Sequence, residues 1–181
     1  MLYRAGAFEA SPDPNIWFSS DASWLDDVVA RFTTMGRLTF FGFCLIDWRS
    51  CKIKAIMTST NHAEFYSSNE ATKDAIYYRQ LLHQLGLGHL VKSIRIQCDN
   101  EGAEALVRGT VSVTKCRHYD LLLFYQCEQS KLGYVHFTLD PSNEIVADIM
   151  TKSLFDPLFS KHRVTLGLVS NASWQSRGRV D

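Results

Sequence analysis

The order of hydrophobic and polar positions predicts alternating strands and helices. Apolar and polar residues alternate over 94–98, which is typical of a half-buried strand. Apolar residues spaced by threes and fours over 61–85 predict the longest helix, which ends at Gly86. The expected strands cover 16–21, 36–46, 52–58, 94–98 and 134–139, and the expected helices cover 61–85, 101–106, 115–131, 144–152 and 156–167. Residues 47–50 are expected to turn between the second and third strands, and the whole order predicts an α/β fold with a mixed sheet.

Chain length and local composition predict the domain boundaries. The 181 residues suffice for one ordinary domain with a full core. Residues 1–15, with two prolines, are expected to form a lead-in segment. We expect one domain over 16–168 and a loose polar tail over 169–181.

Composition and charge exclude several classes of protein. A hydrophobic fraction of 46% excludes a disordered chain. The 19 basic and 19 acidic residues cancel, which argues against a protein held to nucleic acid by bulk charge alone. No apolar run approaches the roughly 20 residues of a membrane span, so no membrane partner is expected. The five scattered cysteines are interpreted as free thiols in a reducing compartment.

Four acidic residues are the candidates for chemistry. Asp21 and Asp99 each end a predicted strand, Glu64 lies near the start of the longest helix, and Asp148 lies in the helix expected over 144–152. A carboxylate at the end of a central strand projects from a rigid element into a crevice that a cation can reach.

Each of these residues also has an ordinary structural interpretation. Asp99 or Asn100 can cap the following helix, and Glu64 can form a capping box with Asn61. Asp21 can be a turn residue, and Asp148 can lie on a solvated helix face.

Six short segments, in order along the chain, carry a family resemblance. They are SDASW (20–24), IDWRSCK (46–52), STNHAEF (59–65), CDNEGAEAL (98–106), KCRHYD (115–120) and VADIMTK (146–152). They are similar to the family's S-D-A-D-W, I-S-W-R-S-K-K, S-S-T-E-A-E-Y, C-D-N-Q-S-A-I-A-L, T-K-H-I-D and L-A-D-I-L-T-K. Over 16–168 the chain thus resembles the ribonuclease H domain of copia-type LTR retrotransposon polyproteins.

The resemblance implies a fold, an activity and a metal site. The expected architecture is a ribonuclease H-like fold, with a five-stranded mixed sheet flanked by helices. The catalytic and metal-binding tetrad would be Asp21, Glu64, Asp99 and Asp148. Their hard oxygen ligands suit Mg²⁺ or Mn²⁺, and two such ions can clamp a phosphodiester displacement. The implied activity is an endonuclease that hydrolyses the RNA strand of an RNA–DNA hybrid.

The resemblance also implies partners and a location. Substrate contacts are expected from Arg49, Lys52, Asn100, Lys115, Arg117 and His118. Besides the RNA–DNA hybrid, a reverse transcriptase domain in the same polyprotein is an expected partner. We expect a monomer inside the cell, either in a cytoplasmic virus-like particle or in the nucleus.

Departures from the family pattern support an alternative function. Ser23 replaces an acid, and Glu101 and Glu104 add negative charge beside the expected crevice. The alternative is a catalytically weak or inactive ribonuclease H-like domain that binds nucleic acid or a protein partner. An integrase or transposase core shares the fold but normally uses three acids with a late glutamate, and Glu64 comes early.

Overall fold

The computed structural model of the chain describes residues 15–24, 32–99 and 120–168. The helix expected over 101–106 and the tail over 169–181 lie outside these ranges, as does all but the last residue of the lead-in segment. The domain boundaries therefore stay predictions.

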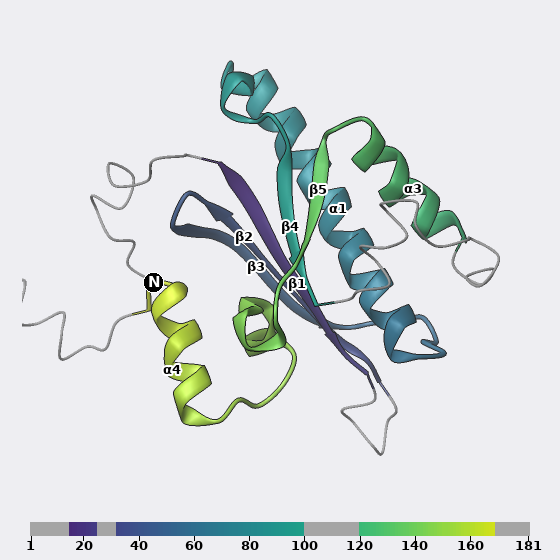
Figure 1. The fold of residues 1–181 in the computed structure, drawn as a ribbon, viewed down its shortest axis with the longest axis vertical. Helices are drawn as coiled ribbons and strands as arrows, with labels where there is room; N and C mark the ends of the chain where they lie inside the picture. The colour runs from purple at the N-terminus through teal and green to yellow at the C-terminus, as the bar shows by residue number, and fades with distance from the viewer. Residues whose placement is uncertain (1–14, 25–31, 100–119, 169–181) are drawn as a thin grey trace, which may run out of the picture.

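A five-stranded sheet with the order β3-β2-β1-β4-β5 forms the centre of the molecule (Figure 1). The strands are β1 (Ile16–Ser23), β2 (Thr34–Phe41), β3 (Cys44–Lys52), β4 (Ile94–Cys98) and β5 (Val135–Leu139). β2 pairs antiparallel with both β1 and β3. β4 runs parallel to β1 and β5. The predicted five-stranded mixed sheet is confirmed.

Helical elements cover both faces of this sheet. They are α1 (Thr60–Gln84), η1 (Gly88–Leu90), α3 (Asp120–Lys131), η3 (Ser142–Glu144), η4 (Val146–Met150) and α4 (Asp156–Thr165). α1 packs on β1, β2 and β4 with α3 beside it, whereas η4 packs on β1 and β2 from the other side and contacts α4 (Figure 1). Within the described ranges, no helix has both the length and the apolar character that crossing a bilayer requires.

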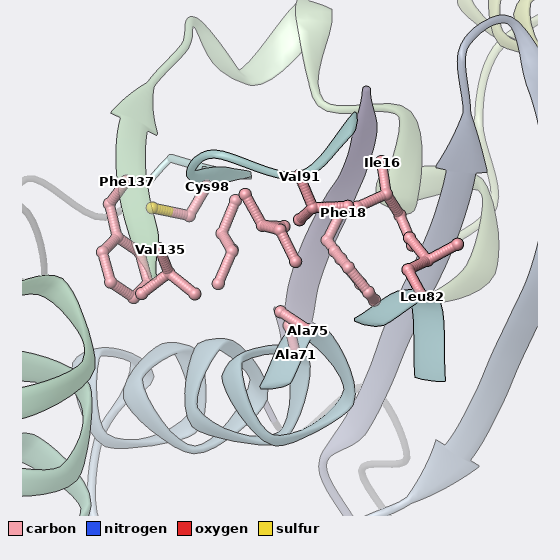
Figure 2. Packing of buried hydrophobic residues seen from close by; sticks show 11 residues of the cluster. Ile16, Phe18, Ala71, Ala75, Leu82, Val91, Cys98, Val135 and Phe137 are labelled. Carbon is pink, nitrogen blue, oxygen red and sulfur yellow. The ribbon is translucent and has the colours of Figure 1, made fainter. Parts of the chain in front are cut away.

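Side chains that alternate along the central strands pack on both faces of the sheet. Phe18 points toward α1, where Figure 2 shows it with Ala71 and Ala75 of that helix. On the opposite face, Leu38 of β2 packs with Ala147 of η4. Burying large apolar side chains on both faces stabilises the layered arrangement by roughly 1.5–3 kcal/mol per side chain. The end of β1 is thereby held rigidly between two packed layers.

The predicted bounds of the second and third strands were wrong. The apolar run over 36–46 contains a hairpin turn at Gly42, which has a positive φ of 58°. A two-residue turn with a left-handed glycine matches the twist of a β-hairpin. Because apolar residues precede and follow this turn, the hydrophobic pattern shows no break there. Residues 47–50, expected as the turn, lie within β3, and most of 52–58 follows the strand.

The helix predicted over 144–152 is wrong: the range contains the last residue of η3 and the short 3₁₀ element η4. The Asp148 N–H donates to the carbonyl of Ile145 at 3.3 Å, an i→i−3 bond. The Ala147 N–H donates instead to the Ser19 hydroxyl of β1 at 3.1 Å. Hydrogen bonding to the sheet therefore replaces part of the regular helical hydrogen bonding that the local sequence pattern favours.

Candidate metal centre

Three carboxylates from distant parts of the chain converge at one end of the sheet. Ligand oxygens of Asp21, Glu64 and Asp99 lie within 4.8 Å of one another. Asp21 lies near the end of β1, and Asp99 directly follows β4. Because β1 and β4 are parallel, their carboxyl ends meet at the same edge, as the sequence prediction required.

Helix α1 delivers Glu64 to this edge. Its N-cap is Ser59, whose hydroxyl accepts a hydrogen bond from the His62 N–H at 3.1 Å. Glu64 Oε1 accepts the Ala22 N–H of β1 at 3.3 Å. The capping-box interpretation with Asn61 is therefore wrong, because Glu64 faces β1 and the cap is two residues earlier.

Asp21 is buried within β1 and held from both sides of the sheet. It is 1% exposed and pairs in register with Gly36 of β2, so the turn interpretation is wrong. Its backbone carbonyl accepts the Ser67 hydroxyl of α1 at 2.8 Å. Its Oδ2 accepts a hydrogen bond from the Thr151 hydroxyl, which follows η4. Asp21 thus has little freedom to move away from the cluster.

Asp148 lies on η4, beside Asp21 but outside the group of three. The Lys152 ammonium is 3.0 Å from Asp148 Oδ2 and 3.8 Å from Asp21 Oδ2, and so joins the two carboxylates. Asp148 is 3% exposed, which overturns the interpretation as a solvated helix residue. Its Oδ1 is buried and has no hydrogen-bond partner among the residues that the structure describes.

Close packing of η4 against β2 depends on a residue without a side chain. A Cβ at Gly36 would lie 2.7 Å from Met150 Cβ and 2.9 Å from the Ala147 carbonyl oxygen. The Ser50 hydroxyl of β3 also donates to the Met150 carbonyl at 2.7 Å. These contacts fix the distance between η4 and β2, whose Gly36 pairs in register with Asp21 of β1.

The carboxyl groups of the cluster hold protons more tightly than isolated acids. Burial, followed by the charges of Asp21 and Asp99, raises the pKa of Glu64 to about 9. Burial and the charge of Asp21 raise the pKa of Asp148 to about 7, against the lowering effect of Lys152. Burial also raises the pKa of Asp21, although Thr151 and Lys152 oppose the change. Such crowding of acids disfavours full ionisation without a cation.

The donor set fits a hard divalent cation. All ligand atoms are carboxylate oxygens, and Mg²⁺ binds oxygen at about 2.1 Å, so opposite ligands of one ion lie about 4.2 Å apart. The three converging carboxylates come close to that spacing. The buried Oδ1 of Asp148, which no donor in the described part of the chain contacts, adds an acceptor that a cation can satisfy.

The structure describes two of the six predicted substrate-binding residues, Arg49 and Lys52. Asn100, Lys115, Arg117 and His118 lie outside the described residues. Arg49 pairs in register with Arg37, whose guanidinium is 2.6 Å from Asp74 of α1, so Arg49 lies on the α1 face. Lys52 is exposed and lies over the Phe32 ring at 4.8 Å. Their contact with substrate stays a prediction.

Two residues of the cluster were missed in the sequence. Thr151 and Lys152 both contact Asp21, and Lys152 also pairs with Asp148 four residues earlier. The signal was the segment VADIMTK, whose match to the family extends past the acid to the threonine and the lysine. An acid and a lysine four residues apart also suggest a local ion pair.

Sequence comparison finds relatives among transposon polyproteins. The chain is 26% identical over 159 residues to the retrovirus-related Pol polyprotein from transposon TNT 1-94 of Nicotiana tabacum, which covers 88% of the chain and 12% of that polyprotein. It is 27% identical over 149 residues to the Pol polyprotein from transposon RE1 of Arabidopsis thaliana, covering 82% of the chain and 10% of the polyprotein. The chain thus spans about a tenth of the length of these relatives. No family model matches the chain.

Structural comparison finds ribonucleases H. The N-terminal ribonuclease H domain of rv2228c from Mycobacterium tuberculosis superposes with a TM-score of 0.55 at 15% identity, covering 78% of this chain and 99% of that one. LC11-RNase H1, isolated from compost, gives a TM-score of 0.56 at 15% identity, covering 76% and 93%. The same enzyme in complex with an RNA/DNA hybrid gives 0.54 at 13% identity, covering 76% and 94%. The fold is therefore ribonuclease H-like, and the sequence is similar to that of Pol polyproteins from copia-type retrotransposons, as the six segments predicted.

Proposed function

We propose that the chain is a metal-dependent endonuclease that hydrolyses the RNA strand of RNA–DNA hybrids. The observation that carries this proposal is the convergence of Asp21, Glu64 and Asp99 within 4.8 Å, with the buried Asp148 beside Asp21. Similarity to an enzyme solved with an RNA/DNA hybrid supports the choice of substrate. The Pol polyprotein relatives, of which the chain spans about a tenth, support a place in a longer polyprotein. A reverse transcriptase domain as the partner, and a location in a cytoplasmic particle or the nucleus, are part of the proposal.

The four acids would hold Mg²⁺ or Mn²⁺ at the edge of the sheet. Asp21 would be the shared ligand, because it groups with Glu64 and Asp99 and also shares Lys152 with Asp148. Ions bound there would supply an acidified water and neutralise charge on the leaving oxygen. Since the pKa of Glu64 is raised to about 9, this carboxyl must release a proton when it becomes a ligand. Metal affinity should therefore increase with pH.

The hybrid would be bound through its backbone and its groove shape. Recognition by 2′-hydroxyls and phosphates gives little sequence preference. The proposed contacts are Arg49, Lys52, Asn100, Lys115, Arg117 and His118. Cleavage should then weaken as the salt concentration increases, because phosphate contacts release counterions.

Cleavage of a labelled RNA–DNA hybrid tests the proposal directly. The purified chain is incubated with the hybrid in Mg²⁺ and in Mn²⁺, beside single-stranded RNA and duplex DNA. The double variant Asp21→Asn, Asp99→Asn controls for contaminating nuclease, and Glu128→Gln is a matched control on an exposed acid of α3.

The outcomes separate the proposal from its alternative. We expect products only from the RNA strand of the hybrid, carrying a 5′-phosphate and a 3′-hydroxyl, from the wild type and Glu128→Gln. Folded wild-type protein that cuts nothing in either metal would overturn the proposed activity and favour a ribonuclease H-like binding domain. Cleavage that survives in the double variant would show that these acids do not carry the reaction.

A further inference from the structure

Lys152 places a positive charge of the chain's own inside the acidic cluster. Its Nζ is 3.0 Å from Asp148 Oδ2 and 3.8 Å from Asp21 Oδ2. The two carboxylates are 4% and 1% exposed, whereas the lysine side chain is 38% exposed. The ammonium therefore enters from solvent and pairs with two buried acids.

The backbone holds Lys152 close to this position. Its N–H donates to the Asp148 carbonyl at 3.1 Å, at the end of η4. η4 is in turn fixed to the sheet by the bond from the Ala147 N–H to the Ser19 hydroxyl. The aliphatic part of the Lys152 side chain can rotate, but these backbone hydrogen bonds fix the position of its Cα.

The ammonium occupies one of two sides of Asp21. On one side, Asp21 converges with Glu64 and Asp99. On the other side, the same carboxylate shares Lys152 with Asp148. The Lys152 charge also acts on Glu64 and, more weakly than on Asp148 and Asp21, on Asp99. Its ion pairs, however, are with Asp148 and Asp21. A cation between those two carboxylates must therefore displace the ammonium, whereas a cation between Asp21, Glu64 and Asp99 has only to bind near it.

We propose that Lys152 is a positioning residue that makes the two metal sites unequal. This inference rests on the proposed function. The side lined by Asp21, Glu64 and Asp99 binds the first ion. The side lined by Asp21 and Asp148 binds a second ion only after Lys152 has swung into solvent, which its partial exposure permits. The lysine thus weakens the second site by competition and neutralises two crowded carboxylates while that site is empty.

Counting bound Mn²⁺ tests this inference without measuring cleavage. Wild-type protein is titrated with Mn²⁺, with free ion followed by electron paramagnetic resonance and heat by calorimetry. Lys152→Met removes the charge, Lys152→Gln removes it but keeps a hydrogen-bond donor, and Lys152→Arg keeps it. Lys161→Met is the matched control, because Lys161 is similarly exposed and pairs with Glu144 on the surface. Circular dichroism in EDTA establishes that each variant is folded.

Wild type, Lys152→Arg and Lys161→Met should bind one Mn²⁺ more tightly than a second. In Lys152→Met and Lys152→Gln, affinity for the second ion should increase by about tenfold or more, because the positive charge that competes for Asp148 and Asp21 is gone. Affinity for the first ion should change less.

Two failures are distinguishable. If wild type binds one Mn²⁺ and loss of the Lys152 charge leaves the second site unchanged or weaker, the inference is wrong and the metal centre stands. If neither wild type nor any folded variant binds Mn²⁺, the proposed metal centre itself is wrong, and the inference is wrong with it.

Discussion

The Thr151 hydroxyl donates a hydrogen bond to the Asp21 carboxylate across a separation of 130 residues. This bond joins the residue that follows η4 to the carboxyl-terminal part of β1, and both residues are buried. It means that the segment carrying Asp148 and the strand carrying Asp21 are positioned by each other. The predictions below depend on that coupling.

Removing this donor should destabilise the protein. Thr151→Val keeps the shape of the side chain but leaves a buried carboxylate oxygen of Asp21 without its partner. We expect a loss of about 1–3 kcal/mol in the free energy of unfolding, measured with urea in EDTA. The same change at the exposed Thr165 of α4 should cost less than about 0.5 kcal/mol. Equal losses in the two variants would contradict a structural role for the bond.

Metal binding should raise the melting temperature through Asp99. Mg²⁺ or Mn²⁺ binds the folded cluster and not the unfolded chain, so millimolar metal should stabilise the wild type. Asp99→Asn should remain folded, but metal should not raise its melting temperature. Metal should still raise the melting temperature of Glu128→Gln, which changes an exposed acid of α3. An increase that persists in Asp99→Asn would show that Asp99 is not a ligand.

Without metal, stability should fall as the pH rises from 7 to 9. Burial raises the pKa of Asp148 to about 7 and that of Glu64 to about 9, so the folded protein retains protons that the unfolded chain releases. Stability from such groups is present below their unfolded pKa and is lost as the pH rises through the folded value. Burial lowers the pKa of His136 and His162, so these histidines make the protein more stable as the pH rises toward about 6.5. Above that pH they are neutral in both the folded and the unfolded state, and they do not change stability between pH 7 and 9.

Chemical unfolding at pH 7, 8 and 9 measures this loss. In EDTA, Glu64→Gln should flatten the fall, because the substituted side chain cannot ionise. Adding Mg²⁺ should also flatten it in the wild type, since the ion neutralises the carboxylates. Wild-type stability that increases over this range in EDTA would refute the raised pKa of Glu64.

Gly36→Ala should push η4 away from the sheet. The added Cβ would lie 2.7 Å from Met150 Cβ and 2.9 Å from the Ala147 carbonyl oxygen, so something must move. We expect a loss of about 1–3 kcal/mol in stability together with weaker metal stabilisation, because Asp148 moves with η4. Thermal unfolding with and without Mg²⁺ measures both effects.

Gly133→Ala provides the contrasting control. Gly133 has a φ of +71°, and an added Cβ would meet no atom of the described residues within 4 Å. Its cost should be about 1 kcal/mol of backbone strain, with the metal effect intact. If Gly36→Ala behaved like Gly133→Ala in both measurements, close packing of η4 would not control the site.

The sequence by itself determined the elements whose signals are local. Alternation over Ile94–Cys98 and apolar spacing in α1 predicted a strand and a helix that match the structure within a residue or so. The ends of those elements placed Asp99 and Glu64 correctly, because a side chain at the end of a regular element has a defined direction. The six ordered segments also indicated the ribonuclease H-like fold, which the structural comparison shows.

The tertiary structure alone decided what depends on contacts between distant residues. The turn at Gly42 interrupts an apolar run that continues in β3, so hydrophobicity does not mark it. Residues 144–152 have a helical pattern, yet η4 is a 3₁₀ turn. The Ser19 hydroxyl accepts the Ala147 N–H, and the absence of a side chain at Gly36 lets η4 pack closely on β2. The pairing of Lys152 with Asp21 likewise follows from that turn. A local sequence pattern indicates which conformations a segment prefers. Packing against the sheet decides which of these conformations the folded protein adopts, and that packing free energy depends on residues outside the segment.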